Sequence, residues 1–347
     1  MRRFRDKDYV ETHEEWFFCV VGESHPHDKL VAYLKYLPGD GQWSRQGKSF
    51  RRAISIYSMQ ELMSTIQFLK KNKPEYVFYD ETTGVEMSCV PLGRISKHYR
   101  CDERLRSILE GHDLDELEGK ARELVESIAD ASGVGFENLG ITGSILLKIH
   151  HPGSDIDIVI YGKENFWKVM QSLDSIDGVK PLDGVMLSEW VKRASARYPI
   201  PKGELSKISK FLKNKRIYKG TPFSIHGVRL DWEVTRSYGE VIYRKVGLAK
   251  IRAKIADASE SCFTPAIYRL SDVEADEGYA TDVEALACFD GTFTAMFDSG
   301  TYIEAFGKVE EVLDLRDKRS TKWLVIGTFE GMNREYIIPI EGASRPP

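Results

Sequence analysis

Residues 140–162, GITGSILLKIHHPGSDIDIVIYG, predict the unit around which the rest of the chain is arranged. Within it, Asp155 and Asp157 are separated by a single apolar residue. Side chains two residues apart on a β-strand point to the same face, so we expect the two carboxylates to lie together. The alternate positions then face a hydrophobic core: Ile156, Ile158 and Ile160. Two adjacent carboxylates repel each other, and a bound Mg²⁺ relieves that repulsion.

A Gly-Ser pair, Gly143 and Ser144, precedes the two aspartates by ten intervening residues. The apolar run 139–142 predicts a short buried strand, and residues 144–150 predict a helix that starts at Ser144. Glycine permits close approach of a ligand, and the free N–H groups at a helix start favour an anion such as phosphate. The whole unit therefore predicts a phosphate-binding turn that faces a metal-binding carboxylate pair.

This pattern, a hydrophobic residue with Gly-Ser followed by Asp-x-Asp, resembles the signature of the DNA polymerase β superfamily of nucleotidyltransferases. The segment SDIDIVIYG is especially similar to the corresponding segment of the minimal, stand-alone members of that superfamily. The resemblance extends over roughly residues 113–236. It implies transfer of a nucleoside monophosphate from a nucleoside triphosphate to an acceptor hydroxyl, with release of pyrophosphate.

The resemblance also implies a site with two Mg²⁺ ions held by Asp155, Asp157 and a third acid on a neighbouring strand. Residues 225–234, IHGVRLDWEV, alternate like such a strand. Within it Asp231 is flanked by Leu230 and Trp232, and it is the favoured third acid because aspartate is short. Glu233 fits the same pattern and is the alternative.

The nucleotide is expected to contact the Gly-Ser turn, the serine before the first aspartate and a basic segment further along the chain. Residues 192–219 carry ten lysines and arginines against a single acid, with aromatic residues between them. Such a segment suits a triphosphate or the backbone of RNA or DNA, although a solvated helix face has the same composition. The predicted nucleotide ligands are Gly143, Ser144, Ser154, Lys207 and Lys210.

Two other functions are compatible with the same residues. A nucleotidyltransferase fold can serve as a non-catalytic nucleotide- or RNA-binding protein, and the position of the third acid distinguishes the two. A metal-dependent phosphohydrolase also uses paired aspartates, but it does not require the Gly-Ser turn. A sequence similar to a P-loop at residues 41–49 is one residue too long and is followed by an alternating strand pattern.

Composition indicates an ordinary soluble protein. The 347 residues are 42% hydrophobic and 29% charged, with a formal net charge of −4, which argues against a polybasic nucleic-acid binder. The five cysteines are widely spaced, which predicts neither disulfides nor a zinc site and fits a reducing cytoplasm. No signal peptide or membrane-spanning run is expected.

The predicted fold is α+β. A central polymerase β-like domain at 102–246, a mixed sheet with helices, is flanked by mainly β domains at 1–101 and 247–347. Residues 50–57 predict a strand of the first domain, and Asp113 is expected to open the longest helix. Closely spaced strands in the last domain predict a small barrel or sandwich.

Overall fold

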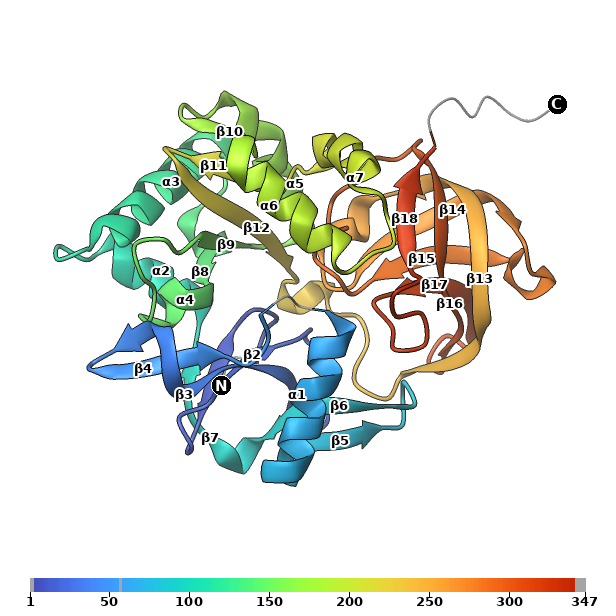
Figure 1. Cartoon of the computed structure of the whole chain (residues 1–347), viewed down its shortest axis with the longest axis horizontal. Coiled ribbons are helices and arrows are strands. Elements are labelled where there is room, and N and C mark those ends of the chain that lie inside the picture. The colour runs from blue at the N-terminus through green and yellow to red at the C-terminus, as the bar shows by residue number, and fades with distance from the viewer. Residues whose placement is uncertain (1–2, 56–57, 341–347) are drawn as a thin grey trace.

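The computed structural model describes residues 3–55 and 58–340. The fold is mixed α+β and mainly strand, with three sheets in chain order and seven α-helices in these ranges. In Figure 1 the first sheet, in blue to cyan, lies below the central sheet, in green to yellow, and the last sheet, in orange and red, lies beside both. No helix in the described ranges has the length and apolar character needed to span a membrane.

The first sheet has the strand order β5-β6-β3-β2-β1-β7, with β4 paired to the end of β3. Its strands are β1 (Tyr9–Thr12), β2 (Phe17–Val20), β3 (Lys29–Arg45), β4 (Lys48–Arg52), β5 (Val77–Asp80), β6 (Val85–Pro91) and β7 (Ile95–Tyr99). Helix α1 (Met59–Asn72) covers one face, where Leu69 joins a core with Phe18 and Leu34. Ser58 caps this helix, and its hydroxyl accepts a hydrogen bond from the Glu61 N–H.

The central sheet has the order β10-β11-β12-β9-β8, and only the β12–β9 pair is parallel. Its strands are β8 (Leu139–Thr142), β9 (Ile156–Tyr161), β10 (Val179–Pro181), β11 (Lys215–Tyr218) and β12 (Thr221–Val228). Helices α2 (Cys101–Leu109), α3 (Glu116–Ser132) and α5 (Lys163–Ser172) supply the core of one face, in which Ile156, Ile158 and Ile160 are fully buried. The opposite face contacts α4 (Gly143–Leu147) and the first sheet.

The last sheet closes on itself. Its strands are β13 (Val241–Asp257), β14 (Ala266–Ala275), β15 (Val283–Cys288), β16 (Tyr302–Asp314), β17 (Arg319–Ile326) and β18 (Tyr336–Pro339). Because β13 pairs with both β14 and β16, the ring β13-β14-β15-β17-β16 is continuous, with β18 added to β16. A barrel, rather than a sandwich, is therefore the form of this sheet.

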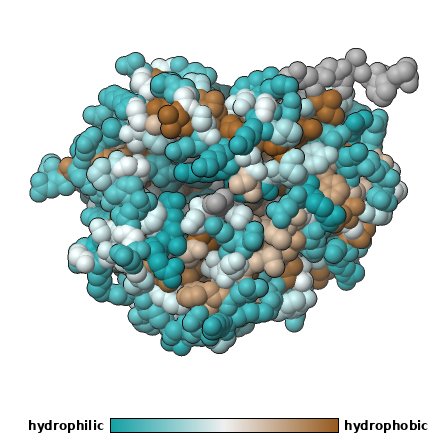
Figure 2. Space-filling model, viewed as in Figure 1, coloured by the Kyte–Doolittle hydropathy of each residue, from teal (hydrophilic) through white to brown (hydrophobic). Residues whose placement is uncertain are grey.

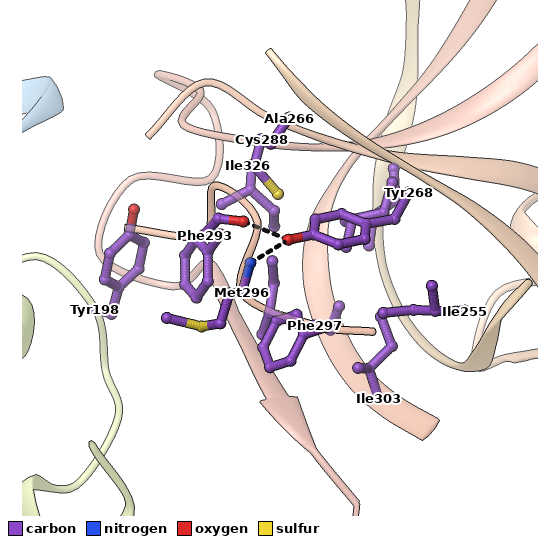
Figure 3. Close-up of a cluster of buried hydrophobic side chains, with 14 of the residues drawn as sticks. Tyr198, Ile255, Ala266, Tyr268, Cys288, Phe293, Met296, Phe297, Ile303 and Ile326 are labelled. Carbon is purple, nitrogen blue, oxygen red and sulfur yellow. Dashed lines mark hydrogen bonds between the residues drawn. The ribbon is translucent and has the colours of Figure 1, made fainter. Parts of the chain in front are cut away.

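Two further helices, α6 (Gly184–Ser195) and α7 (Lys202–Ile208), share the core of this barrel. At its centre the Tyr268 hydroxyl donates to the Phe293 carbonyl at 2.5 Å and accepts from the Met296 N–H at 3.0 Å, among the aromatic and aliphatic side chains of Figure 3. Hydrophilic residues cover most of the face in Figure 2, and the hydrophobic groups there form small, separate patches. The apolar residues are thus used mainly between the sheets and helices.

Three expected boundaries are wrong. The strand predicted over 50–57 ends at Arg52, and residues 56–57 lie outside the described ranges. The longest helix starts at Glu116 rather than Asp113, because Asp115 and Glu118 form the capping box. The helix predicted over 144–150 is the single turn Gly143–Leu147, which ends where Lys148 adopts a left-handed conformation.

Candidate functional site

Asp155 and Asp157 lie at the start of β9, on the face of the central sheet that is turned toward the first sheet. Asp155 immediately precedes the strand and is exposed, whereas the Asp157 side chain is 24% exposed. The alternation predicted from the sequence is present, because the isoleucines at 156, 158 and 160 pack against the helices on the other face. The first strand of the predicted site is therefore oriented as expected.

A row of polar side chains crosses the sheet at the level of Asp157. Thr142 of β8 is the register partner of Asp157, Ser224 of β12 is its partner on the other side, and Lys215 of β11 pairs with Ser224. The Ser224 hydroxyl donates to Asp157 Oδ1 at 2.5 Å. The His226 Nε2 lies 3.4 Å from the same oxygen and 2.9 Å from the Ser224 Oγ. One oxygen of Asp157 is thus held in place by β12.

These contacts separate the pKa values of the two aspartates. Burial opposes ionisation of Asp157, but hydrogen bonds from His226 and Ser224 outweigh it and hold its pKa well below the usual range. The negative charge of Asp157 raises the pKa of Asp155. Burial lowers the pKa of His226 despite the nearby carboxylate, which favours the neutral imidazole. The pair consists of one firmly ionised carboxylate and one whose ionisation is opposed by its neighbour.

Gly143 brings the backbone close to Asp157. Its φ of +69° lies in the left-handed region, and a Cβ added there would lie 2.3 Å from the Asp157 Oδ2. Ser144 follows it and is buried, as is Ser154, whose hydroxyl accepts from the His151 N–H at 3.1 Å and shapes the turn before β9. The Gly-Ser turn and the aspartates are therefore adjacent in space.

Neither predicted third acid lies on a strand of the central sheet. β12 ends at Val228, and Asp231 and Glu233 occupy a 3₁₀ turn beyond it. Asp231 Oδ1 accepts a hydrogen bond from Arg5 at 2.8 Å, and the Arg5 guanidinium lies over Tyr161, at the end of β9 opposite to the aspartate pair. Expecting a strand as far as residue 234 was therefore wrong.

Despite their alternating sequence, residues 229–234 form a turn whose Glu233 side chain caps backbone N–H groups, and they do not form a strand. The Glu233 carboxylate accepts from the backbone N–H groups of Lys163 at 2.9 Å and Leu230 at 2.8 Å. Trp232, which flanks Asp231, is 75% exposed. The neighbouring strand carries Ser224 and His226 where the resemblance implies an acid, and neither residue was predicted. The alternation of Ser224, His226 and Val228 is the signal that could have identified them.

Lys207 and Lys210 lie beside β18 of the barrel, where they line a shallow pocket with Pro339. Lys207 is bonded to Glu204 at 2.8 Å, and Lys210 lies over the Phe211 ring. Other cations of the basic segment are paired with acids elsewhere, among them Arg197 with Asp290. Lys215 is the cation of this segment that belongs to the polar row beside Asp157.

A second cluster could hold a metal ion in principle. Donor atoms of Asp115, Glu118 and His150 lie within 4.8 Å of one another. The buried Arg104 already pairs with Glu118, and the His150 Nε2 is 2.7 Å from the Asp115 Oδ2. Together with the capping role of both acids, these contacts account for the cluster as a structural element.

Comparison with known proteins finds no matching family model and no matching solved structure. One curated protein is similar along almost its whole length: the uncharacterized protein MJ1086 of Methanocaldococcus jannaschii. It is 31% identical over 343 residues, which cover 96% of this chain and 98% of that protein. The chain therefore belongs to the same family as this uncharacterized archaeal protein.

Proposed function

We propose that this protein is a magnesium-dependent nucleotidyltransferase, with the central sheet as a polymerase β-like domain between two β domains. The observation that carries the proposal is the approach of Gly143 to Asp157. A glycine that admits no side chain, directly followed by a serine and facing the second aspartate, is the arrangement that the Gly-Ser and Asp-x-Asp pattern implies. The site lies on the face of the central sheet opposite its helices.

The residues of the site fit a magnesium ion. Mg²⁺ prefers carboxylate oxygens and keeps positions for water and substrate phosphates. Asp157 is ionised, and its charge raises the pKa of Asp155, so an empty pair is electrostatically unfavourable. When bound, the metal supplies charge neutralisation and polarisation of the phosphoryl group.

Each neighbouring residue has a defined role in this proposal. Asp155 and Asp157 hold the metal, and Ser224 and His226 orient Asp157 through one oxygen. The Gly143 backbone allows the phosphate chain to approach. The Lys215 ammonium adds positive charge beside the leaving pyrophosphate. Because β12 carries no acid, we assign two metal-binding carboxylates and not three.

The test is replacement of each aspartate by alanine, with labelled nucleoside triphosphates and Mg²⁺. We expect Asp155→Ala and Asp157→Ala to reduce transfer at least about a thousandfold while the fold is kept. Asp231→Ala is the matched control, because this acid is exposed and paired with Arg5. Transfer at the wild-type rate in either site variant would exclude the proposal.

The missing acid on β12 favours a second candidate, a protein that binds a nucleotide without turning it over. Two-metal transfer ordinarily needs an additional carboxylate at the attacking oxygen. Product analysis separates the possibilities: a labelled acceptor indicates transfer, released phosphate indicates hydrolysis, and binding without either indicates a sensor. RNA, DNA and small hydroxyl compounds are the acceptors to supply.

A further inference from the structure

We propose that the first sheet completes the nucleotide site, with Lys35 and Arg52 binding the phosphate chain of the ligand whose metal is held by Asp155 and Asp157. This inference rests on the proposed function and extends its site to residues outside the polymerase β-like resemblance. It means that the first hundred residues are part of the binding machinery.

The first sheet packs directly on the aspartate-bearing face of the central sheet. Tyr9 and Tyr36 share a buried cluster with Val159 and Tyr161. The side chains of Val159 and Tyr161 lie on the same face of β9 as those of the aspartates. The far end of β3 also reaches the loop that leads into Asp155, because the Ser44 N–H donates to the Ile149 carbonyl at 3.3 Å. The two sheets therefore enclose the start of β9 between them.

Lys35 lies on the side of β3 that faces this interface, with Tyr33 before it and Tyr36 after it. Phe17 pairs with Tyr36 and Phe18 with Leu34, so Lys35 is the extra residue opposite the Phe17–Phe18 step. A bulge places consecutive side chains on one face and is often used to re-aim a side chain. Leu34 packs on the α1 side, whereas Tyr36 packs on the central sheet. Lys35 accompanies Tyr36, and its Nζ lies 5.9 Å from the Tyr36 ring centroid.

Arg52 reaches the same place from the adjacent strand. It is the register partner of Tyr36 across the β3–β4 pair. Its guanidinium lies 4.6 Å from the Trp43 ring centroid and 5.9 Å from that of Tyr36. Within the described part of the chain, its Nε is buried and has no hydrogen-bond partner. An unsatisfied guanidinium N–H in this position is a donor suited to a phosphate oxygen.

Two neighbouring cations repel each other, and a bound anion relieves this repulsion. Burial, together with the charge of Arg52, lowers the pKa of Lys35 to about 8. Both cations also interact electrostatically with Asp155. With Lys215 these residues carry three positive charges against the two of the aspartates, and a metal ion would add two more. The site with one metal ion would then carry a net charge of about three positive, and a nucleoside triphosphate, with about four negative charges, is a ligand class of opposite charge and similar magnitude.

The experiment uses the full chain and the variants Lys35→Met and Arg52→Met, with Lys29→Met as the matched control. Lys29 lies on the same strand as Lys35 but six residues away, roughly 20 Å along an extended strand, where it pairs with Asp28. Binding of inorganic tripolyphosphate without metal is measured by calorimetry. Each site variant should weaken binding about tenfold or more, and Lys29→Met by less than about twofold.

A second measurement separates this inference from the proposed function. Asp157→Asn should keep metal-free tripolyphosphate binding and lose the gain that Mg²⁺ gives to nucleoside triphosphate binding. If Lys35→Met and Arg52→Met bind tripolyphosphate as Lys29→Met does, the inference is overturned even when Mg²⁺-dependent transfer persists. If both variants lose tripolyphosphate but wild type neither binds nor turns over nucleotides with Mg²⁺, the phosphate site stands and the proposed function falls.

Discussion

Replacing Gly143 by alanine adds one methyl group where the turn after β8 passes closest to Asp157. Two separate costs follow. The backbone φ of +69° is unfavourable for an alanine by about 1–2 kcal/mol. The new Cβ would also lie 2.3 Å from the Asp157 Oδ2, so the carboxylate or the turn must move. Overpacking of this kind typically costs about 1–3 kcal/mol.

Gly133 provides the control for the first cost alone. It ends α3 with a φ of +68°, and a Cβ there meets nothing within 4 Å. The adjacent Val134 belongs to the same core as β8 and β9, so both variants report on one cooperative unit. We expect Gly143→Ala to destabilise this core by about 2–5 kcal/mol and Gly133→Ala by about 1–2 kcal/mol.

Urea unfolding and hydrogen exchange of the β8 and β9 amides would measure the difference, since exchange reports the opening of this sheet separately from the other two. Mg²⁺-dependent nucleotide binding should fall in Gly143→Ala and stay unchanged in Gly133→Ala. Equal destabilisation of the two variants, with nucleotide binding intact in both, would refute the close approach of Gly143 to Asp157 as the reason for this glycine.

Three further changes test other parts of the structure. Arg104→Met leaves Glu118 buried without its partner and should cost about 3–5 kcal/mol in urea unfolding; an unchanged midpoint would contradict the ion pair. Hydrogen bonds from Tyr76 and Lys73 outweigh burial and lower the pKa of Glu14 to about 2, so its stabilisation is present above pH 4.5 and is lost toward pH 2. The thermal advantage of wild type over Glu14→Gln should shrink over that range, and a constant difference would argue against it. Asp231→Asn should leave nucleotide affinity within about twofold, because its carboxylate pairs with Arg5; a tenfold loss would return it to the site.

The local sequence pattern correctly predicted how the aspartates are oriented on β9. The alternation of Ile156, Ile158 and Ile160 fixed the orientation of Asp157, because a strand has a period of two. The same alternation misled at Asp231, where the parallel partner β9 has already ended at Tyr161 and the chain turns into a cap. Periodicity shows which residues share a face, but it does not show how far the neighbouring strand extends.

The contribution of the first sheet could not be predicted for a different reason. Alternation alone places Lys35 with Tyr33 on the side of β3 opposite Leu34, but only the packing of the two sheets brings that side to the aspartate-bearing face of β9. Ser224 and His226 likewise matter only because β12 lies beside β9. Each of these contacts is set by pairing between distant segments.

The packing of the first sheet also determines which hydrophobic surface is uncovered while the chain is being synthesised. Its aromatic face is covered by residues near 146–161, and the turn after β5 is bonded to the barrel strand β13, where the Tyr243 N–H donates to the Thr82 carbonyl at 2.7 Å. A nascent chain synthesised from its N-terminus therefore displays Tyr9, Phe17 and Tyr36 uncovered until the central segment follows. Once residues 1–100 have emerged from the ribosome, and before the central segment does, the chain would hold a sheet with one face closed by α1 and the other open to chaperones or to premature association.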